Sequence, residues 1–142
     1  MPLTAKNISM GEAKQIEYLP NNTVLISING TLDGLVPLKL DRQSSKVLTV
    51  VFDDVTDKDK KFEGKTLKLI DGDTALKILD FIEINKNKNF LIHCAAGISR
   101  SAAVALFINR YYGHELKPRF WSVSHPNCYV LGKLTTVKEC KY

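Results

Sequence analysis

The stretch NFLIHCAAGISRSAAVALFINRYYG, residues 89 to 113, decides the fold of this chain. NFLIHC is a short apolar run, which is typical of a buried strand. RSAAVALFINRYY, residues 100 to 112, is rich in alanine and has no helix-breaking residue before Gly113. It therefore predicts a largely buried helix that ends at a glycine. Between the two runs lies a short loop of small or apolar residues that follows Cys94, so the stretch predicts a strand, a tight loop and a helix in direct succession.

Other segments show the same two kinds of pattern. Strands are predicted at residues 23–28 and 47–52, and helices at residues 9–18, 73–84 and 127–137. VLTVVF, residues 47–52, is almost continuously apolar, as expected for a central strand that is covered on both faces. Asp71 or Asp73 is the expected N-cap of the middle helix, and Asn127 that of the last helix. Ser9 and Glu12 have the spacing of a capping box.

The alternation of strands and helices predicts an α/β fold with a central, mainly parallel (mixed) sheet flanked by helices. Neither repeats nor a composition change divides the chain, so residues 1–142 are expected to form a single domain. In parallel sheets, ligands bind beyond the carboxyl ends of the strands. Cys94 closes one predicted strand there, and Asp53 and Asp54 follow another.

The composition limits which binding partners and which cellular compartment are expected. The 142 residues are 44% hydrophobic and carry a formal charge of +5, which suits an anionic partner but does not distinguish nucleic acid from a phosphorylated protein or metabolite. Three cysteines are too few for a disulfide framework, so we expect a reducing, cytoplasmic environment. Neither a CxxC pair nor HExxH occurs, and we predict no metal and no cofactor. No signal peptide or apolar run of about 20 residues is present, so no membrane association is expected.

The loop after Cys94 has the composition of an anion site next to a reactive thiol. A free cysteine thiol has a pKa of about 8.5, which a helix N-terminus and cationic neighbours lower to roughly 3.5–7.5. The backbone N–H groups of residues 95–99 can turn inward, and Gly97 lets the backbone approach a ligand closely. Arg100 provides a planar fork that fits two phosphate oxygens, and Ser101 can donate a hydrogen bond to the sulfur.

His93-Cys94-x-x-Gly97-x-x-Arg100-Ser101 resembles the HCxxGxxR[ST] signature of the protein tyrosine phosphatase superfamily, and the chain length resembles its compact dual-specificity branch. VFDD at 51–54 and HPNCYVLGKL at 125–134 resemble, more weakly, the segment of the general acid and the start of the last helix in that branch. The similarity spans most of residues 45 to 137. It implies a dual-specificity phosphatase-like fold and hydrolysis of phosphomonoesters through a phosphocysteine.

The resemblance also implies a role for each signature residue. Cys94 is the expected nucleophile, and Arg100 binds phosphate and stabilises the transition state. His93 holds the loop and tunes the thiolate, and Ser101 assists the sulfur. The phosphate-binding residues are Ala95, Ala96, Gly97, Ile98, Ser99 and Arg100.

The general acid has three candidates. Asp54 aligns best with the acid of the family, with Asp53 and Asp57 as the alternatives. The 40-residue interval from Asp54 to Cys94 is longer than in compact members. The extra length lies in the charged segment TDKDKKFEGKTLKLIDGD, residues 56–73, interpreted as a lid or a surface insertion.

The expected substrate is a phosphorylated protein, carrying phosphotyrosine and, as a further option, phosphoserine or phosphothreonine, and we expect a monomer. Phosphoinositides, RNA ends and nucleotides are the alternatives, although the uncharged loop residues argue against highly charged lipid headgroups. Nucleic acid is disfavoured, because KPRFW at 117–121 is interpreted as packing and not as a stacking platform. Other hypotheses are a non-catalytic phosphate-binding module and a sulfur-transferring or arsenate-reducing enzyme.

Overall fold

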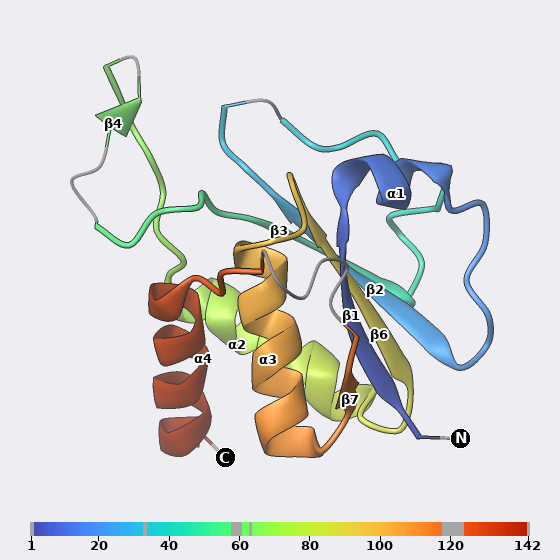
Figure 1. Cartoon of the computed structure of the whole chain (residues 1–142). Coiled ribbons are helices and arrows are strands. Elements are labelled where there is room, and N and C mark those ends of the chain that lie inside the picture. The colour runs from blue at the N-terminus through green and yellow to red at the C-terminus, as the bar shows by residue number, and fades with distance from the viewer. Residues whose placement is uncertain (1, 33, 58–60, 63, 118–123, 142) are drawn as a thin grey trace.

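Five parallel strands in the order β3-β2-β6-β1-β7 form the central sheet of the protein, seen in a computed structural model that describes residues 2–32, 34–57, 61–62, 64–117 and 124–141 (Figure 1). The strands are β1 (Thr4–Ser9), β2 (Thr23–Asn29), β3 (Val47–Val51), β6 (Asn89–Cys94) and β7 (Glu115–Leu116). Every neighbouring pair in this sheet runs parallel. The α/β prediction is thus confirmed, and the described part of the main sheet contains no antiparallel pair.

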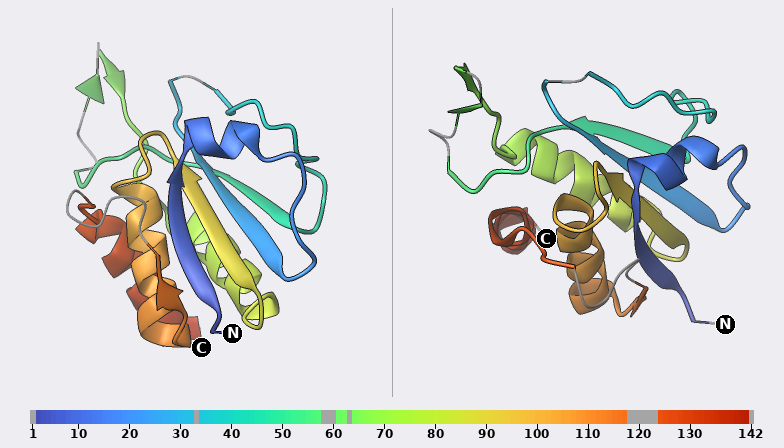
Figure 2. Two further views of the ribbon diagram at one scale, coloured as in Figure 1. Left: turned by 45° about the vertical axis from the view of Figure 1, so that its right-hand side comes forward. Right: turned by 45° about the horizontal axis from the view of Figure 1, so that its top comes forward.

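Helices cover both faces of the sheet. On one face lie α2 (Gly72–Ile84), α3 (Arg100–Tyr112) and α4 (Cys128–Lys141), while α1 (Met10–Gln15) and the irregular segment between β2 and β3 lie on the other (Figures 1 and 2). The larger hydrophobic core joins the sheet to α2, α3 and α4, and a smaller cluster around Ile8, Leu25 and Val47 lies on the opposite face. β2 is accordingly buried along its whole length, including its polar residues Thr23, Ser27 and Asn29.

The position of β3 differs from the prediction. VLTVVF is at the edge of the sheet and only partly buried, whereas β2 and β6 occupy the centre. The apolar run reflects packing of β3 against α2 and against the segment before it, and does not require a neighbouring strand on each side. An apolar run therefore predicted burial and not the order of the strands.

Four strands were missed and one helix was predicted too long. TAKNIS forms β1, Glu115–Leu116 forms β7, and β4 (Lys61–Phe62) pairs antiparallel with β5 (Lys65–Thr66) inside the charged segment. This small hairpin projects from the body of the molecule (Figure 1). The capping box of Ser9 and Glu12 is present, but α1 ends at Gln15 and not near Tyr18, since Ile16 turns into extended backbone and packs on the smaller cluster.

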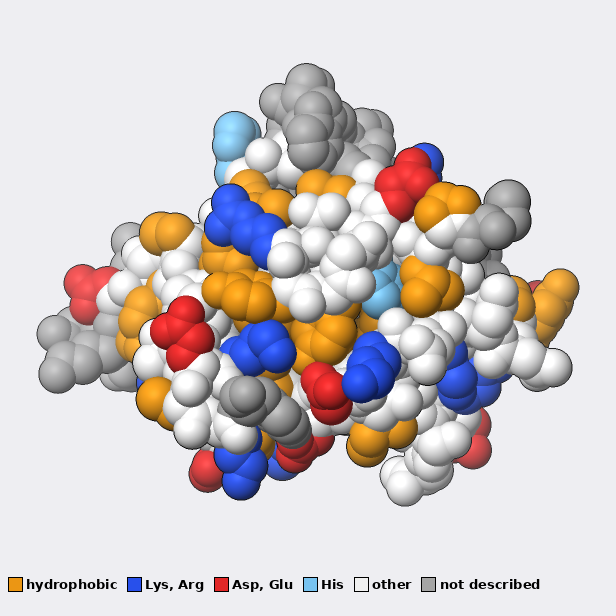
Figure 3. All heavy atoms as spheres, turned by 90° about the horizontal axis from the view of Figure 1, so that it is seen from below, with side chains coloured by type: hydrophobic (Ala, Val, Ile, Leu, Met, Phe, Trp, Pro, Cys, Tyr) orange, Lys and Arg blue, Asp and Glu red, His pale blue; other side chains and the backbone are white. Residues whose placement is uncertain are grey.

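The loop after Cys94 marks one end of the sheet as the place to look for a functional site. The carboxyl ends of β1, β2, β3 and β6 lie at one end, together with the loop after Cys94. The face seen from below in Figure 1 shows basic and acidic side chains interspersed among its described residues (Figure 3). No helix in the described part of the chain is long and apolar enough to cross a membrane.

Candidate functional site

The candidate site is the loop of residues 95–99, which joins β6 to α3 at the carboxyl edge of the parallel sheet. Parallel strands place their carboxyl ends at one edge, so this loop meets the end of β1 at Ser9 and the segment after β3. α3 begins at Arg100, and the hydroxyl of Ser99 makes no capping hydrogen bond to it. The positive end of the helix dipole therefore faces the loop without a side-chain cap.

Most carbonyl groups of the loop bond to the segments around it and point away from the space that the loop encloses. Four of them accept hydrogen bonds from other segments: Ala95 from Met10 N (3.1 Å), Gly97 from Asn7 Nδ2 (2.6 Å), Ile98 from His125 N (2.7 Å) and Ser99 from Asn127 N (3.1 Å). In a trans peptide the following N–H points opposite to the carbonyl, and the described residues contain no cis peptide. The N–H groups of the following residues therefore point away from these partners, as an anion-binding loop requires.

Gly97 is required at its position for two reasons. Its φ is +79°, in the left-handed region that favours glycine. A Cβ at this position would lie 2.5 Å from the carbonyl carbon of Ile8 and 2.7 Å from the nitrogen of Ser9, both backbone atoms of the neighbouring strand end. The loop therefore packs directly on the backbone of β1.

Cys94 and Arg100 lie on either side of the loop. The sulfur of Cys94, which is 2% exposed, lies 3.1 Å from the hydroxyl of Ser101. Arg100 is 7% exposed, and its Nη1 donates to the carbonyl of Phe52 at 2.8 Å. Its Nε is buried and has no hydrogen-bond partner among the described residues. An unpaired buried guanidinium nitrogen is costly, and an oxyanion in the loop would pair it.

His93 is fully buried beneath the loop. Its Nε2 lies 2.6 Å from the hydroxyl of Ser27, and its Nδ1 lies 3.4 Å from the carbonyl of Cys94. Burial lowers the pKa of His93 to about 4, the bond to the Cys94 carbonyl opposes this shift, and the positive charges of Arg42 and Arg100 add to it. The ring is therefore neutral at pH 7 and holds its neighbours without carrying a charge.

Asp53 is an anchored carboxylate, 7% exposed. It accepts hydrogen bonds from Thr31 N (2.9 Å), Thr31 Oγ1 (2.7 Å) and Lys68 N (2.7 Å), so both of its oxygens are engaged. Burial raises its pKa, but these hydrogen bonds and the charge of Arg100 outweigh burial, and the net pKa lies below its usual range. An ionised, fully bonded carboxylate is poorly suited to donate a proton.

Asp54 has a different environment. It is exposed, and its Oδ1 accepts hydrogen bonds from Ser99 Oγ (2.7 Å) and Asn127 Nδ2 (2.8 Å). Its Oδ2 has no hydrogen-bond partner in the described part of the chain, so one oxygen is fixed and the other is available for a proton. The side-chain oxygen of Asn127 also caps α4 by accepting from Tyr129 N and Val130 N. Asn127 is therefore the predicted cap, and it also connects Asp54 to the loop.

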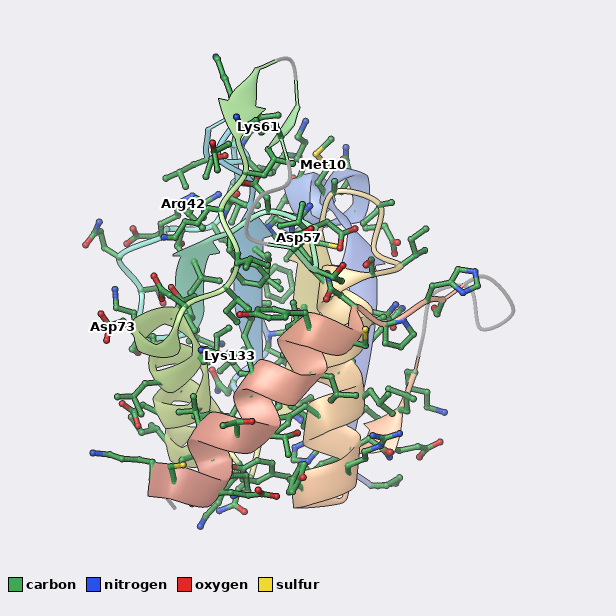
Figure 4. All side chains as sticks on the ribbon, turned by 90° about the vertical axis from the view of Figure 1, so that its left-hand side faces the viewer. Met10, Arg42, Asp57, Lys61, Asp73 and Lys133 are labelled. Carbon is green, nitrogen blue, oxygen red and sulfur yellow. The ribbon has the colours of Figure 1, made fainter. Side chains whose placement is uncertain are left out.

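Two cavities flank Asp54. One, of about 470 Å³, lies between residues 54–57, Ser99 and the start of α4, and Asp57 lines it. The other, of about 550 Å³, is lined by apolar and charged side chains that include Met10, Leu32, Leu67, Lys65, Asp54 and Arg100. Met10 and Asp57 lie at this same end of the molecule (Figure 4).

Of the segment KPRFW, only Lys117 belongs to the described residues.

Several residues around the loop could not be found from the sequence. Asn7 holds Gly97 from a strand that was not predicted, and Ser27 supports His93 from the middle of β2. Arg42 donates to Ser27 from the irregular segment between β2 and β3. No motif marks any of the three. The contiguous signature, by contrast, was visible because its residues share one loop.

No protein-family model matches this chain, and no curated protein is significantly similar to it.

Proposed function

We propose that the chain is a cysteine-dependent phosphomonoester hydrolase of the protein tyrosine phosphatase superfamily, with a dual-specificity phosphatase-like fold. One arrangement carries the proposal. Cys94 lies beneath a loop in which four carbonyls bond to the surrounding segments, and beside the loop lies the buried Nε of Arg100, which has no hydrogen-bond partner among the described residues. Inward N–H groups, a helix N-terminus and a guanidinium together favour a tetrahedral dianion. A sulfur at the base of such a site is placed to attack the phosphorus.

The reaction takes place in two steps. The thiolate of Cys94 attacks phosphorus, the bond from phosphorus to the leaving oxygen breaks, and Asp54 gives its proton to that oxygen. Water then attacks the phosphocysteine, Asp54 takes up a proton from the water, and the sulfur–phosphorus bond breaks to release inorganic phosphate. Arg100 and the loop N–H groups stabilise the charge on the equatorial oxygens in both steps. Ser101 stabilises the sulfur as it leaves.

Asp54 is the candidate acid that the contacts favour over Asp53 and Asp57. Its Oδ1 is fixed by Ser99, a residue of the loop itself, so the carboxyl group stays next to the bound phosphate. Asp53 is held ionised by Thr31, Lys68 and the charge of Arg100. Asp57 lines the cavity beside the start of α4.

The larger cavity supports an aromatic phosphate ester as substrate. Met10, Leu32 and Leu67 give it apolar walls next to Arg100, and its volume of about 550 Å³ accommodates a tyrosine ring. Phosphotyrosine in a protein fits this lining better than the polyphosphorylated headgroup of a lipid, since the variable loop residues carry no charge. Phosphoserine and phosphothreonine, whose side chains are shorter, are the alternative protein substrates of the same site.

Hydrolysis of an aryl phosphate in the presence of a chelator tests the proposal. The native protein is expected to hydrolyse the aryl phosphate. Cys94→Ser should lose activity by about 10⁴-fold or more while still binding inorganic phosphate. Cys128→Ser is the matched control, because this cysteine is exposed at the start of α4, and its activity should equal that of the native protein. Activity that survives in Cys94→Ser, or that is lost with the chelator, would contradict the mechanism. Phosphate binding without turnover would instead indicate a non-catalytic module.

A further inference from the structure

A chain of hydrogen bonds leads from the far side of the sheet to the first peptide of the loop. Arg42, half-buried between β2 and β3, donates through Nη1 to the hydroxyls of Ser27 (3.0 Å) and Thr49 (2.8 Å), and through Nη2 to the carbonyl of Val36. Ser27 contacts Nε2 of His93. Figure 4 shows Arg42 on the side of the molecule away from α3 and α4.

The partners of Ser27 decide which nitrogen of His93 carries the proton. A hydroxyl has one proton to donate and two lone pairs to accept with. Arg42 can only donate to Ser27, and so can the amide nitrogen of Asn29, whose orientation is fixed by the carbonyl of Val50. Among the described residues, Nε2 of His93 is then the one neighbour that can accept the proton of Ser27. The proton of His93 must therefore lie on Nδ1.

A proton on Nδ1 has a consequence for the loop. Nδ1 faces the carbonyl of Cys94 at 3.4 Å, so the ring can donate to the first peptide bond after the nucleophile. A carbonyl held in this way turns the N–H of Ala95 to the opposite side, as in the other peptides of the loop. The opposite tautomer would place a lone pair of Nδ1 against the carbonyl oxygen and would lose this support.

We propose that Arg42 is a positioning residue of the site: through Ser27 it keeps His93 in the Nδ1–H form, which orients the first peptide of the phosphate loop. The charged groups that act on the ring are both cations, Arg42 from the segment before β3 and Arg100 from α3. No carboxylate of the described residues is hydrogen-bonded to the ring. The expected effect of Arg42 on turnover rests on the proposed function, whereas its expected effect on the tautomer of His93 does not.

The deciding measurement is NMR of the imidazole nitrogens of His93 at pH 7, which distinguishes the two tautomers. The native protein is expected to show the proton on Nδ1, and Arg42→Met should add a population with the proton on Nε2. Arg42→Met should also lower kcat/KM for an aryl phosphate about tenfold. Ser27→Ala should have the same effect, and the double variant should lose no more than the larger single loss, since both act through one path.

The matched control is Lys46→Met. Lys46 belongs to the same segment and donates through Nζ to the carbonyls of Leu19 and Pro20, whereas the hydrogen bonds of the Ser27 hydroxyl go to His93, Asn29 and Arg42. Its tautomer and kcat/KM should match those of the native protein. Arg42→Lys keeps the charge and a single donor nitrogen, and should retain more of the Nδ1–H form than Arg42→Met.

Two results would overturn the inference: a proton on Nε2 in the native protein, or an Arg42→Met variant that is less stable but has the native tautomer and the native kcat/KM. A native protein that hydrolyses no phosphate ester, with a tautomer that still changes in Arg42→Met, would contradict the proposed function and leave the positioning role of Arg42 standing.

Discussion

The loop of residues 95–99 and the segment of residues 53–57 meet at the same end of the sheet, but they are held in different ways. Groups from β1, α1 and the approach to α4 bind four of the loop carbonyls, and Gly97 lies against the backbone of Ile8. Asp54, in contrast, is exposed and is fixed by two side-chain donors. Changes in the loop should therefore damage both fold and chemistry, whereas changes at Asp54 should affect the chemistry alone.

The strongest test of this contrast is Gly97→Ala. The added methyl group would meet backbone atoms of Ile8 and Ser9 and would strain a φ of +79°, so the loop must shift. We expect activity to fall about 1,000-fold and the free energy of unfolding to fall by about 3 kcal/mol, measured by aryl phosphate turnover and urea unfolding.

Gly64→Ala is the control for Gly97→Ala. Gly64 has the same φ of +79°, but its added methyl group would meet no atom within 4 Å. Only the backbone strain remains, about 1 kcal/mol, and turnover should stay at the native level. Equal effects of the two substitutions would show that the contact with β1 is unimportant.

The second prediction concerns His93 and pH. Burial lowers its folded pKa to about 4, below the unfolded value of about 6.5, so the unfolded chain binds the proton first. The contribution of His93 to stability is complete above pH 6.5 and is lost as the pH falls from 6.5 to about 4. Between pH 7 and 4.5 this loss is about 2.5 kcal/mol.

Urea unfolding at pH 7 and pH 4.5 measures this loss, and His93→Gln, which cannot take up the proton, should lose correspondingly less. NMR titration of the ring in the folded native protein is an independent check. A ring that titrates near pH 6.5 in the folded state would contradict the burial argument.

The third prediction separates the adjacent aspartates. Asp54→Asn should lower kcat about 100-fold, flatten the alkaline limb of the pH–rate profile, and leave stability within about 0.5 kcal/mol, because its side chain is exposed. Asp53→Asn should instead lower stability by about 2 kcal/mol, since Thr31 and Lys68 lose a charged acceptor, and should lower kcat less. If Asp53→Asn flattens the alkaline limb and Asp54→Asn does not, the acid is Asp53.

The smallest expected effect is at Asn127. Asn127→Ser keeps an oxygen that can cap α4 but removes the amide that reaches Asp54, so kcat should fall about tenfold with little loss of stability. Asp71→Ser likewise replaces an N-cap residue by serine, at the start of α2 and away from the loop, and should leave kcat unchanged. A kcat for Asn127→Ser that equals the native value would limit Asn127 to capping.

The parts of the molecule that sequence reasoning found are those encoded in contiguous residues. The strand, loop and helix around Cys94 and the helix capped by Asp71 lie where their local patterns predict. β1 escaped detection because TAKNIS is short and only partly apolar, and its burial comes from pairing with β6. Periodicity also could not place β3 at the edge, since strand order depends on the connections.

The same limit applies to the site. Signature residues from His93 to Ser101 are neighbours in the chain, but their supports Asn7, Ser27 and Arg42 come from three other segments. The choice between Asp53 and Asp54 depends on where the backbone turns after β3, which decides which carboxylate meets Lys68 and which meets Ser99. Two adjacent residues of the same type carry no sequence signal for that turn.

The place of β1 in the sheet has a consequence for how the protein folds. Ala5 pairs with Phe90 on one side and with Leu116 on the other, so β1 can pair only after the second half of the chain is available. Closing such long loops is slow compared with forming helices. The backbone of β1 on which Gly97 packs is thus fixed late, and a chain still being synthesised lacks the proposed phosphate site until β6 and β7 have emerged. In a refolding experiment, turnover should return only with the last kinetic phase, after most of the helical signal.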